Sequence, residues 1–119
     1  VYKRQGQDIS PHMVKFAKKR VDEIYCGDAV NPKIADGTAD VVFVRFINSE
    51  VLKAVVARKM IHPLLRSLKR GGYIVIFGHT PVLVSAADLL MDKGLKIDRC
   101  IGGDPKWDGV FQYYVCHKV

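Results

Sequence analysis

Two aspartates stand where strand-like segments end, and their carboxylates are the first candidates for ligand binding. Asp8 belongs to the end of an expected strand at residues 6–9, and Asp28 follows the apolar residues 24–26. The stretch between the two aspartates has room for one helix and one strand. A carboxylate placed after such a strand can accept hydrogen bonds from both hydroxyls of a ribose. The two residues are therefore candidate ligand contacts.

His79 is the candidate general base of the sequence. It follows the apolar run at residues 73–77, and open α/β sheets bind ligands at the carboxyl ends of their strands. An imidazole also titrates in the range that suits proton transfer. The alternative is a histidine at a helix entry that only bonds nearby backbone.

Three further side chains could contact a substrate. Phe46 could form a wall of the pocket, and Arg45 could hold an acidic substrate, although an arginine at a strand end also forms structural ion pairs. Trp107 lies in the polar loop at residues 102–109, where it could cover the pocket or pack on the neighbouring strands.

The first half of the chain predicts short elements that would position these residues. Ser10 and Pro11 predict a helix start, because serine caps helices and proline suits the first helical position. Apolar residues recur at helical spacing from Met13 to about residue 20. A short strand is expected at residues 24–26, and a loop at residues 30–38.

The second half predicts strands that are covered on both faces. Residues 40–44 and 73–77 are unbroken apolar runs, which are typical of central parallel strands. A long helical region should open at Ser49 and Glu50, kink or restart at Pro63, and end at the glycine pair 71–72.

Another helix should follow Thr80 and Pro81 and close at Gly94. Two final strands are expected at about residues 96–101 and 110–117. Their short connection makes the pair antiparallel, whereas the alternating elements before it predict parallel strands. The predicted fold class is α/β, with a doubly wound, mainly parallel sheet and a C-terminal antiparallel strand.

Composition indicates one globular unit near the low end of self-sufficient size, with 119 residues and 49% hydrophobic content. The net charge of +7 comes largely from predicted helices without interleaved aromatic residues, so solvated helix faces are expected and no nucleic-acid partner. Without a long apolar run or a signal sequence, we expect a cytoplasmic protein with no membrane segment. Three scattered cysteines predict buried, reduced thiols and no metal site.

The order and spacing of these segments resemble the class I (Rossmann-like) S-adenosylmethionine-dependent methyltransferase family. Residues 6–13 resemble the end of its second strand, and residues 26–29 the end of its third. Residues 36–42 resemble the approach to its fourth strand, and residues 68–73 the turn into its fifth, where Arg70 stands in place of the usual proline.

This resemblance implies S-adenosylmethionine as the cofactor and assigns residues to it. Asp8 would bind the ribose and Ile9 would pack on the adenine. Asp28 would accept from the adenine amino group, and the backbone amide of Ala29 would donate to the ring. The remaining assignments are Val44 and Arg45 for the cofactor and Phe46, Asn48 and Trp107 for the substrate.

The resemblance also implies an N-terminally truncated fragment, because the family's first strand and glycine-rich loop should precede Gly6. Residues 1–5 match the translation of a transposase adapter used for sequencing libraries. We therefore interpret residues 1–5 as non-native and residues 6–119 as a partial domain, with an ordinary charged arm as the alternative. The missing strand should leave a gap in the sheet.

The expected function is methyl transfer to a small, metabolite-like acceptor. Residues 45–48 lack the Asn/Asp-Pro-Pro-aromatic signature of enzymes that methylate amide or nucleobase nitrogens. A catalytically silent binding or scaffolding subunit is the alternative. An aminopropyltransferase is disfavoured, because Arg45 occupies a position where that class has a carboxylate.

Overall fold

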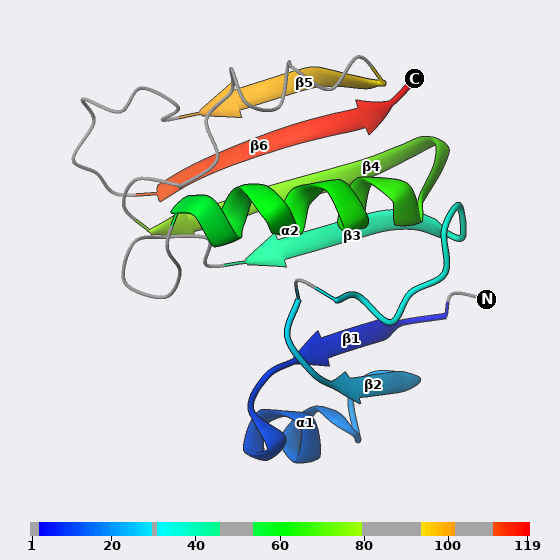
Figure 1. Ribbon diagram of the computed structural model, residues 1–119, viewed down its shortest axis with the longest axis vertical. Coiled ribbons are helices and arrows are strands. Elements are labelled where there is room, and N and C mark those ends of the chain that lie inside the picture. The colour runs from blue at the N-terminus through cyan, green and yellow to red at the C-terminus, as the bar shows by residue number, and fades with distance from the viewer. Residues whose placement is uncertain (1–2, 30, 46–53, 80–93, 102–110) are drawn as a thin grey trace. The chain divides into compact units, whose positions relative to one another are not determined.

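The computed structural model describes residues 3–29, 31–45, 54–79, 94–101 and 111–119 (Figure 1). The chain divides into two compact units, Val1–Ile34 and Ala35–Val119. The expected features at Ser49, Glu50, Thr80 and Pro81 lie outside the described residues, as does the whole loop expected at residues 102–109.

The smaller unit consists of strand β1 (Gln5–Asp8), helix α1 (Pro11–Ala17) and strand β2 (Glu23–Cys26). The two strands pair in parallel, with Asp8 opposite Cys26. Ser10 caps α1, because its hydroxyl accepts a hydrogen bond from the amide of Met13 at 3.4 Å. The predicted helix start is therefore confirmed, and both strands end at the same edge of this small sheet.

The apolar face expected for α1 differs from the one that the structure shows. Met13 and Phe16 are 49% and 58% exposed, whereas Val14 and Ala17 are half-buried. Helix α1 spans only 7 residues and contacts both β1 and β2. A helix this short covers the strands with a narrow stripe, so the flanking apolar residues remain at the surface.

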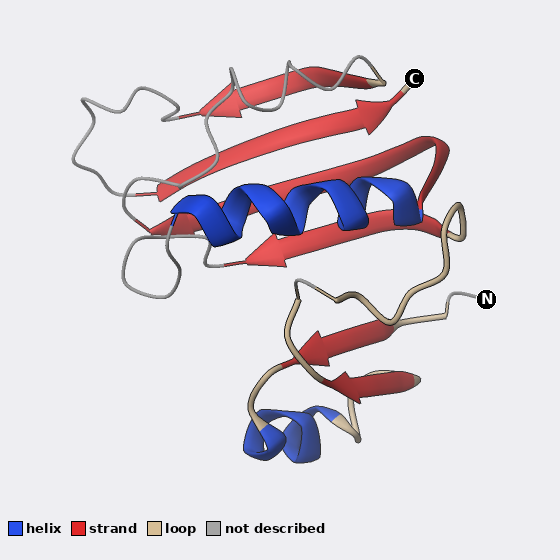
Figure 2. Ribbon diagram, in the orientation of Figure 1, coloured by secondary structure: helices blue, strands red, loops and turns tan. Residues whose placement is uncertain are grey.

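The larger unit contains a four-stranded sheet in the order β3-β4-β6-β5 (Figure 2). Its strands are β3 (Ala39–Arg45), β4 (Leu68–His79), β5 (Leu95–Ile101) and β6 (Phe111–Lys118). Strands β3 and β4 are parallel, while β6 runs antiparallel to both β4 and β5. The predicted C-terminal antiparallel strand is confirmed.

Helix α2 (Ala54–Ser67) packs on β4 and forms the core of the larger unit with one face of the sheet (Figure 1). Alternate residues of each strand point toward this layer, as the period of two requires. The most deeply buried side chains are Leu68, Ile74, Ile76, Tyr114, Cys116 and Ser67.

The opposite face of the sheet is more exposed than the apolar runs predicted. Val41 is 48% exposed, Phe43 is 70% exposed, and Tyr73 is 46% exposed. Within the described part of this unit, α2 is the helix present, and it covers one face. The helix cover expected at these three positions is therefore not seen among the described residues of this unit.

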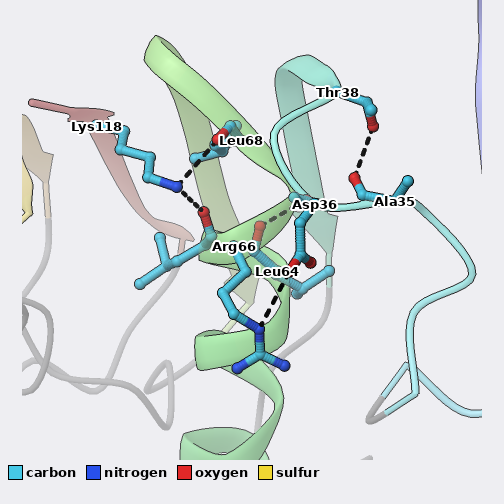
Figure 3. A network of polar contacts seen from close by, with 9 residues as sticks. Ala35, Asp36, Thr38, Leu64, Arg66, Leu68 and Lys118 are labelled. Atoms are coloured by element: carbon cyan, nitrogen blue, oxygen red, sulfur yellow. Dashed lines mark hydrogen bonds and ion pairs between the residues drawn. The ribbon is translucent and has the colours of Figure 1, made fainter.

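Helix α2 ends at Ser67, four residues before the glycine pair that was expected to close it. A helix end leaves its last four carbonyls without partners in the helix. Here all four accept hydrogen bonds, at Leu64 from Ser67 Oγ, at Leu65 from Lys118 Nζ, at Arg66 from Gly37 N and at Ser67 from Thr38 N. Figure 3 shows the part of this closure that Lys118 makes, in which it also donates to the carbonyl of Leu68 at 3.0 Å.

The glycine pair instead lies within β4, where backbone geometry requires it. Gly71 has a φ of 78°, in the left-handed region that favours glycine. A Cβ on Gly72 would come within 2.9 Å of the carbonyl oxygen of Lys69. Pro63 lies inside α2, which continues through it as a single helix, so the predicted restart does not occur.

The thiols divide between surface and core. Cys26 and Cys100 are exposed and Cys116 is buried, and all three are free. The expectation of buried thiols therefore holds only for Cys116. Among the described residues, no helix has the length and apolar character needed to cross a membrane.

Candidate functional site

Asp8 is held at the end of β1 by its own backbone neighbourhood. Its Oδ1 accepts a hydrogen bond from the amide of Ser10 at 2.8 Å, and its carbonyl accepts from the amide of Gly27 at 3.0 Å. The other carboxylate oxygen, Oδ2, has no hydrogen-bond partner among the described residues. Asp8 thus combines a fixed orientation with acceptor capacity for a ligand hydroxyl.

Ile9 lies beside this carboxylate and presents an apolar side chain to solvent, with 68% of its surface exposed. Its carbonyl accepts from the thiol of Cys26, with the sulfur 3.7 Å away. This contact joins the ends of β1 and β2. An apolar surface next to an oriented carboxylate suits a nucleoside, which has a hydroxylated sugar and a flat ring.

Asp28 and Ala29 lie in the loop that follows β2. The amide of Asn31 donates to the carbonyl of Asp28 at 3.0 Å, which closes a turn at the start of this loop. Asp28 is exposed and Ala29 is half-buried. Asp8, Ile9, Asp28 and Ala29 therefore all lie at or after the carboxyl ends of the paired strands β1 and β2.

Gln7 joins β1 to the same loop, and the sequence analysis assigned it no role. Its Nε2 donates to the carbonyls of Asp28 at 2.8 Å and Asn31 at 3.2 Å. Its Oε1 accepts from the amide of Lys33 at 2.9 Å. The signal in the sequence was a polar residue directly before Asp8, where the resemblance expects an apolar strand.

The other assigned residues belong to the larger unit. Val44 is buried in its core with 8% of its surface exposed, so only its backbone remains for a ligand contact. Arg45 ends β3 and is exposed, and His79 ends the parallel strand β4 at the same edge of the sheet. The side chain of His79 lies outside what the structure describes, as do Phe46, Asn48 and Trp107.

A shallow cleft of about 230 Å³ lies at the opposite edge of this sheet, beside the end of α2. It is lined by His62, Leu65, Arg66, Gly94, Leu95 and Lys118. Because the ammonium of Lys118 already donates to the carbonyls of Leu65 in α2 and Leu68 at the start of β4, this cleft belongs to the helix closure. The described residues include no group of three or more His, Cys, Asp or Glu that could hold a metal ion.

The ion pairs of the smaller unit lie near the amino-terminal ends of β1 and β2. The ammonium of Lys3 lies 2.5 Å from Glu23 and lowers the pKa of that carboxyl, while the pKa of Lys3 rises in turn. A hydrogen bond to Glu23 also raises the pKa of the Tyr25 hydroxyl. These groups lie at the start of β2, away from Asp8.

Comparison with known proteins identifies the family. Residues 3–76, which include β1 through most of β4, match the family described as "Methyltransferase domain". The chain belongs to the class I S-adenosylmethionine-dependent methyltransferases. The cofactor of this family is S-adenosylmethionine, and both Asp8 and Asp28 lie within the matched part of the methyltransferase domain.

One relative is isonocardicin synthase from Nocardia uniformis subsp. tsuyamanensis, with 38% identity over 113 residues. The match covers 95% of this methyltransferase domain and 37% of the relative. The chain therefore spans little more than a third of the length of the curated relative that it matches.

Solved structures share the fold of the methyltransferase domain at low sequence identity. The N-methyltransferase NodS from Bradyrhizobium japonicum WM9 aligns with a TM-score of 0.73 and 13% identity, over 98% of this chain and 73% of that one. The [4+2]-cyclase SpnF aligns with a TM-score of 0.70 and 15% identity, over 98% of this chain and 66% of that one. These matches confirm the predicted Rossmann-like fold.

Proposed function

We propose that the protein carrying this chain transfers the methyl group of S-adenosylmethionine to a small-molecule acceptor. The observation that carries the proposal is the edge of the β1-β2 sheet. There the oriented carboxylate of Asp8, the exposed side chain of Ile9 and the residue Asp28 follow the ends of two paired strands. Isonocardicin synthase is named after a product, and NodS is described as an N-methyltransferase. Both descriptions are consistent with small acceptors.

Each residue of this edge has a role that the family resemblance implies and that its chemistry suits. The Asp8 carboxylate accepts hydrogen bonds from the ribose hydroxyls, with Oδ1 already oriented by Ser10. Ile9 packs against the adenine, Asp28 accepts from its amino group, and the amide of Ala29 donates to its ring. These contacts fix the nucleoside half of the cofactor and so set the position of its sulfonium.

Residues at the ends of β3 and β4 are the candidates for acceptor contacts in this proposal. The bound cofactor provides a methyl group on a sulfonium, which needs no further activation. The protein therefore contributes mainly alignment of the acceptor atom with that methyl group. His79 takes up a proton when the acceptor must lose one, and Arg45 holds an acidic acceptor near the end of β3.

Calorimetric titration of the complete gene product with S-adenosylhomocysteine tests the cofactor site. Asp8→Ala should weaken binding by about 1.5–3 kcal/mol, the range for a hydrogen bond to a charged group. Asp28→Ala should loosen recognition of the adenine. Asp36→Ala is the control, because it also removes an exposed carboxylate, but one that has no assigned role at the cofactor site. The Asp36 carboxylate lies 4.0 Å from the Nε of Arg66 in the larger unit. Unchanged affinity for Asp8→Ala removes the ribose role.

A second candidate is cofactor binding without methyl transfer, including a silent scaffolding role. The similarity to SpnF favours it, since that protein is described as a cyclase and shares the fold. Incubation with cofactor labelled in the methyl group separates the two candidates. Label recovered in an acceptor supports methyl transfer, while intact binding with no methyl label in any product supports the second candidate.

A further inference from the structure

Gln7 contacts the loop after β2 through both hydrogen-bonding atoms of its side chain, Nε2 and Oε1. The amide group lies one residue before Asp8 and reaches three backbone positions, at Asp28, Asn31 and Lys33. These positions span the whole turn that carries the assigned adenine contacts. A Cβ added to Gly27 would lie 3.6 Å from Nε2 of Gln7, so the loop runs closely around this side chain.

Backbone hydrogen bonds hold the described residues of this loop at two points. The described ones join Gly27 to Asp8 and Asn31 to Asp28. Without the Gln7 amide, the carbonyl of Asn31 and the amide of Lys33 would turn to water. Because Asp28 and Lys33 are exposed, such a change would reorganise the loop more readily than it would unfold the chain.

We propose that Gln7 is a positioning residue for adenine recognition, which holds the loop at residues 28–33 so that Asp28 and Ala29 meet the base. This inference rests on the proposed function. Gln7 acts through the loop and makes no contact with the cofactor itself. The two N–H groups of the Gln7 side-chain amide hold the carbonyls of Asp28 and Asn31 near β1. Its Oε1 holds the backbone amide of Lys33 in the same way.

The chain offers a matched control on the same strand. Gln5 is also a glutamine of β1, but its Nε2 donates to the side chain of Glu23 at 3.1 Å and not to the loop. Gln5→Leu therefore removes a side-chain amide from β1 without releasing the loop. Gln7→Glu complements Gln7→Leu, because it keeps an acceptor for Lys33 but loses both donors.

The test is calorimetric titration of the complete gene product with two ligands, S-adenosylhomocysteine and S-inosylhomocysteine, which has an oxygen in place of the adenine amino group. Gln7→Leu should weaken binding of the adenosyl ligand roughly 10-fold, about the value of one net hydrogen bond. It should also reduce the preference for the adenosyl over the inosyl ligand. Gln7→Glu should act in the same direction, and Gln5→Leu should match the wild type.

The outcomes separate this inference from the proposed function. A wild-type protein that binds neither ligand overturns both. A wild type that binds, together with Gln7→Leu of equal affinity, overturns only the role of Gln7. A weaker Gln7→Leu with an unchanged preference between the two ligands also overturns it, because a purely structural role would lower both affinities alike. If Gln7→Leu does not fold, the near-isosteric Gln7→Glu decides by the same criteria.

Discussion

The two units of the chain are stabilised by different interactions. In the described part of the smaller unit, no side chain is buried, and the loop after β2 is attached by the polar side chain of Gln7. In the larger unit, Ile74, Ile76 and Cys116 are completely buried between α2 and the sheet. The difference indicates that substitutions in the smaller unit should change binding, whereas those in the larger unit should change stability.

The largest expected effect is the loss of a core side chain in the larger unit. Ile76→Ala should lower the free energy of unfolding by about 2–5 kcal/mol, because it removes buried methyl groups and leaves a cavity. Met13→Ala, at an exposed position of α1, should change it by no more than about 0.5 kcal/mol. Chemical denaturation of both variants measures this contrast, and equal losses would contradict the division into two kinds of unit.

The reactivity of the three cysteines tests the burial of the larger unit's core without any substitution. Burial, followed by the nearby charges of Asp98 and Cys100, raises the pKa of Cys116 from 9.0 to about 11. At pH 8 its thiolate fraction is then about 100-fold below that of an ordinary thiol. Alkylation followed by peptide mass spectrometry should modify exposed Cys26 and Cys100 first. Modification of Cys116 at the rate of Cys26 would show that the core is open.

The smallest expected effect concerns the polar contact of Lys118 in the larger unit. Lys118→Met should destabilise the protein by about 1–3 kcal/mol, because it removes the donor to the carbonyl of Leu65 in α2 and to that of Leu68 at the start of β4. Lys69→Met is the control. Its ammonium contacts Asp40 at 3.1 Å with both side chains at least half exposed, and such a pair contributes about 0–1 kcal/mol. Thermal unfolding should rank the two variants in this order, and a reversed ranking would show that Lys118 does not hold the helix end.

Local patterns were sufficient wherever the determining partners lie close in sequence. The start of α1 was predictable because Ser10 bonds a backbone amide three residues away and Pro11 suits the first turn. The places of Asp8 and Asp28 at or after strand ends were predictable from the succession of strand, helix and strand. The parallel strands and the antiparallel pair β5-β6 followed from the order of elements and the lengths of their connections.

Tertiary contacts decided the features that these patterns missed. Helix α2 ends at Ser67 because the loop at residues 37–38 and Lys118, which is 53 positions from Leu65, satisfy its last carbonyls. The exposure of Phe43 depends on which face α2 covers, and an apolar run does not specify that. Gln7 reaches a loop 21–26 positions away.

The sequence by itself determined the family, the cofactor class, the order of the described strands and helices, and the places of the two aspartates that we propose as nucleoside contacts. Capping and periodicity are set by interactions between near neighbours, so they can be read without a structure. Only the tertiary structure decided where α2 stops, which apolar residues are buried, and that Gln7 holds the loop of Asp28. Those outcomes depend on partners brought together by folding, and hydrogen bonds across 20 to 50 positions leave no periodic trace in the sequence.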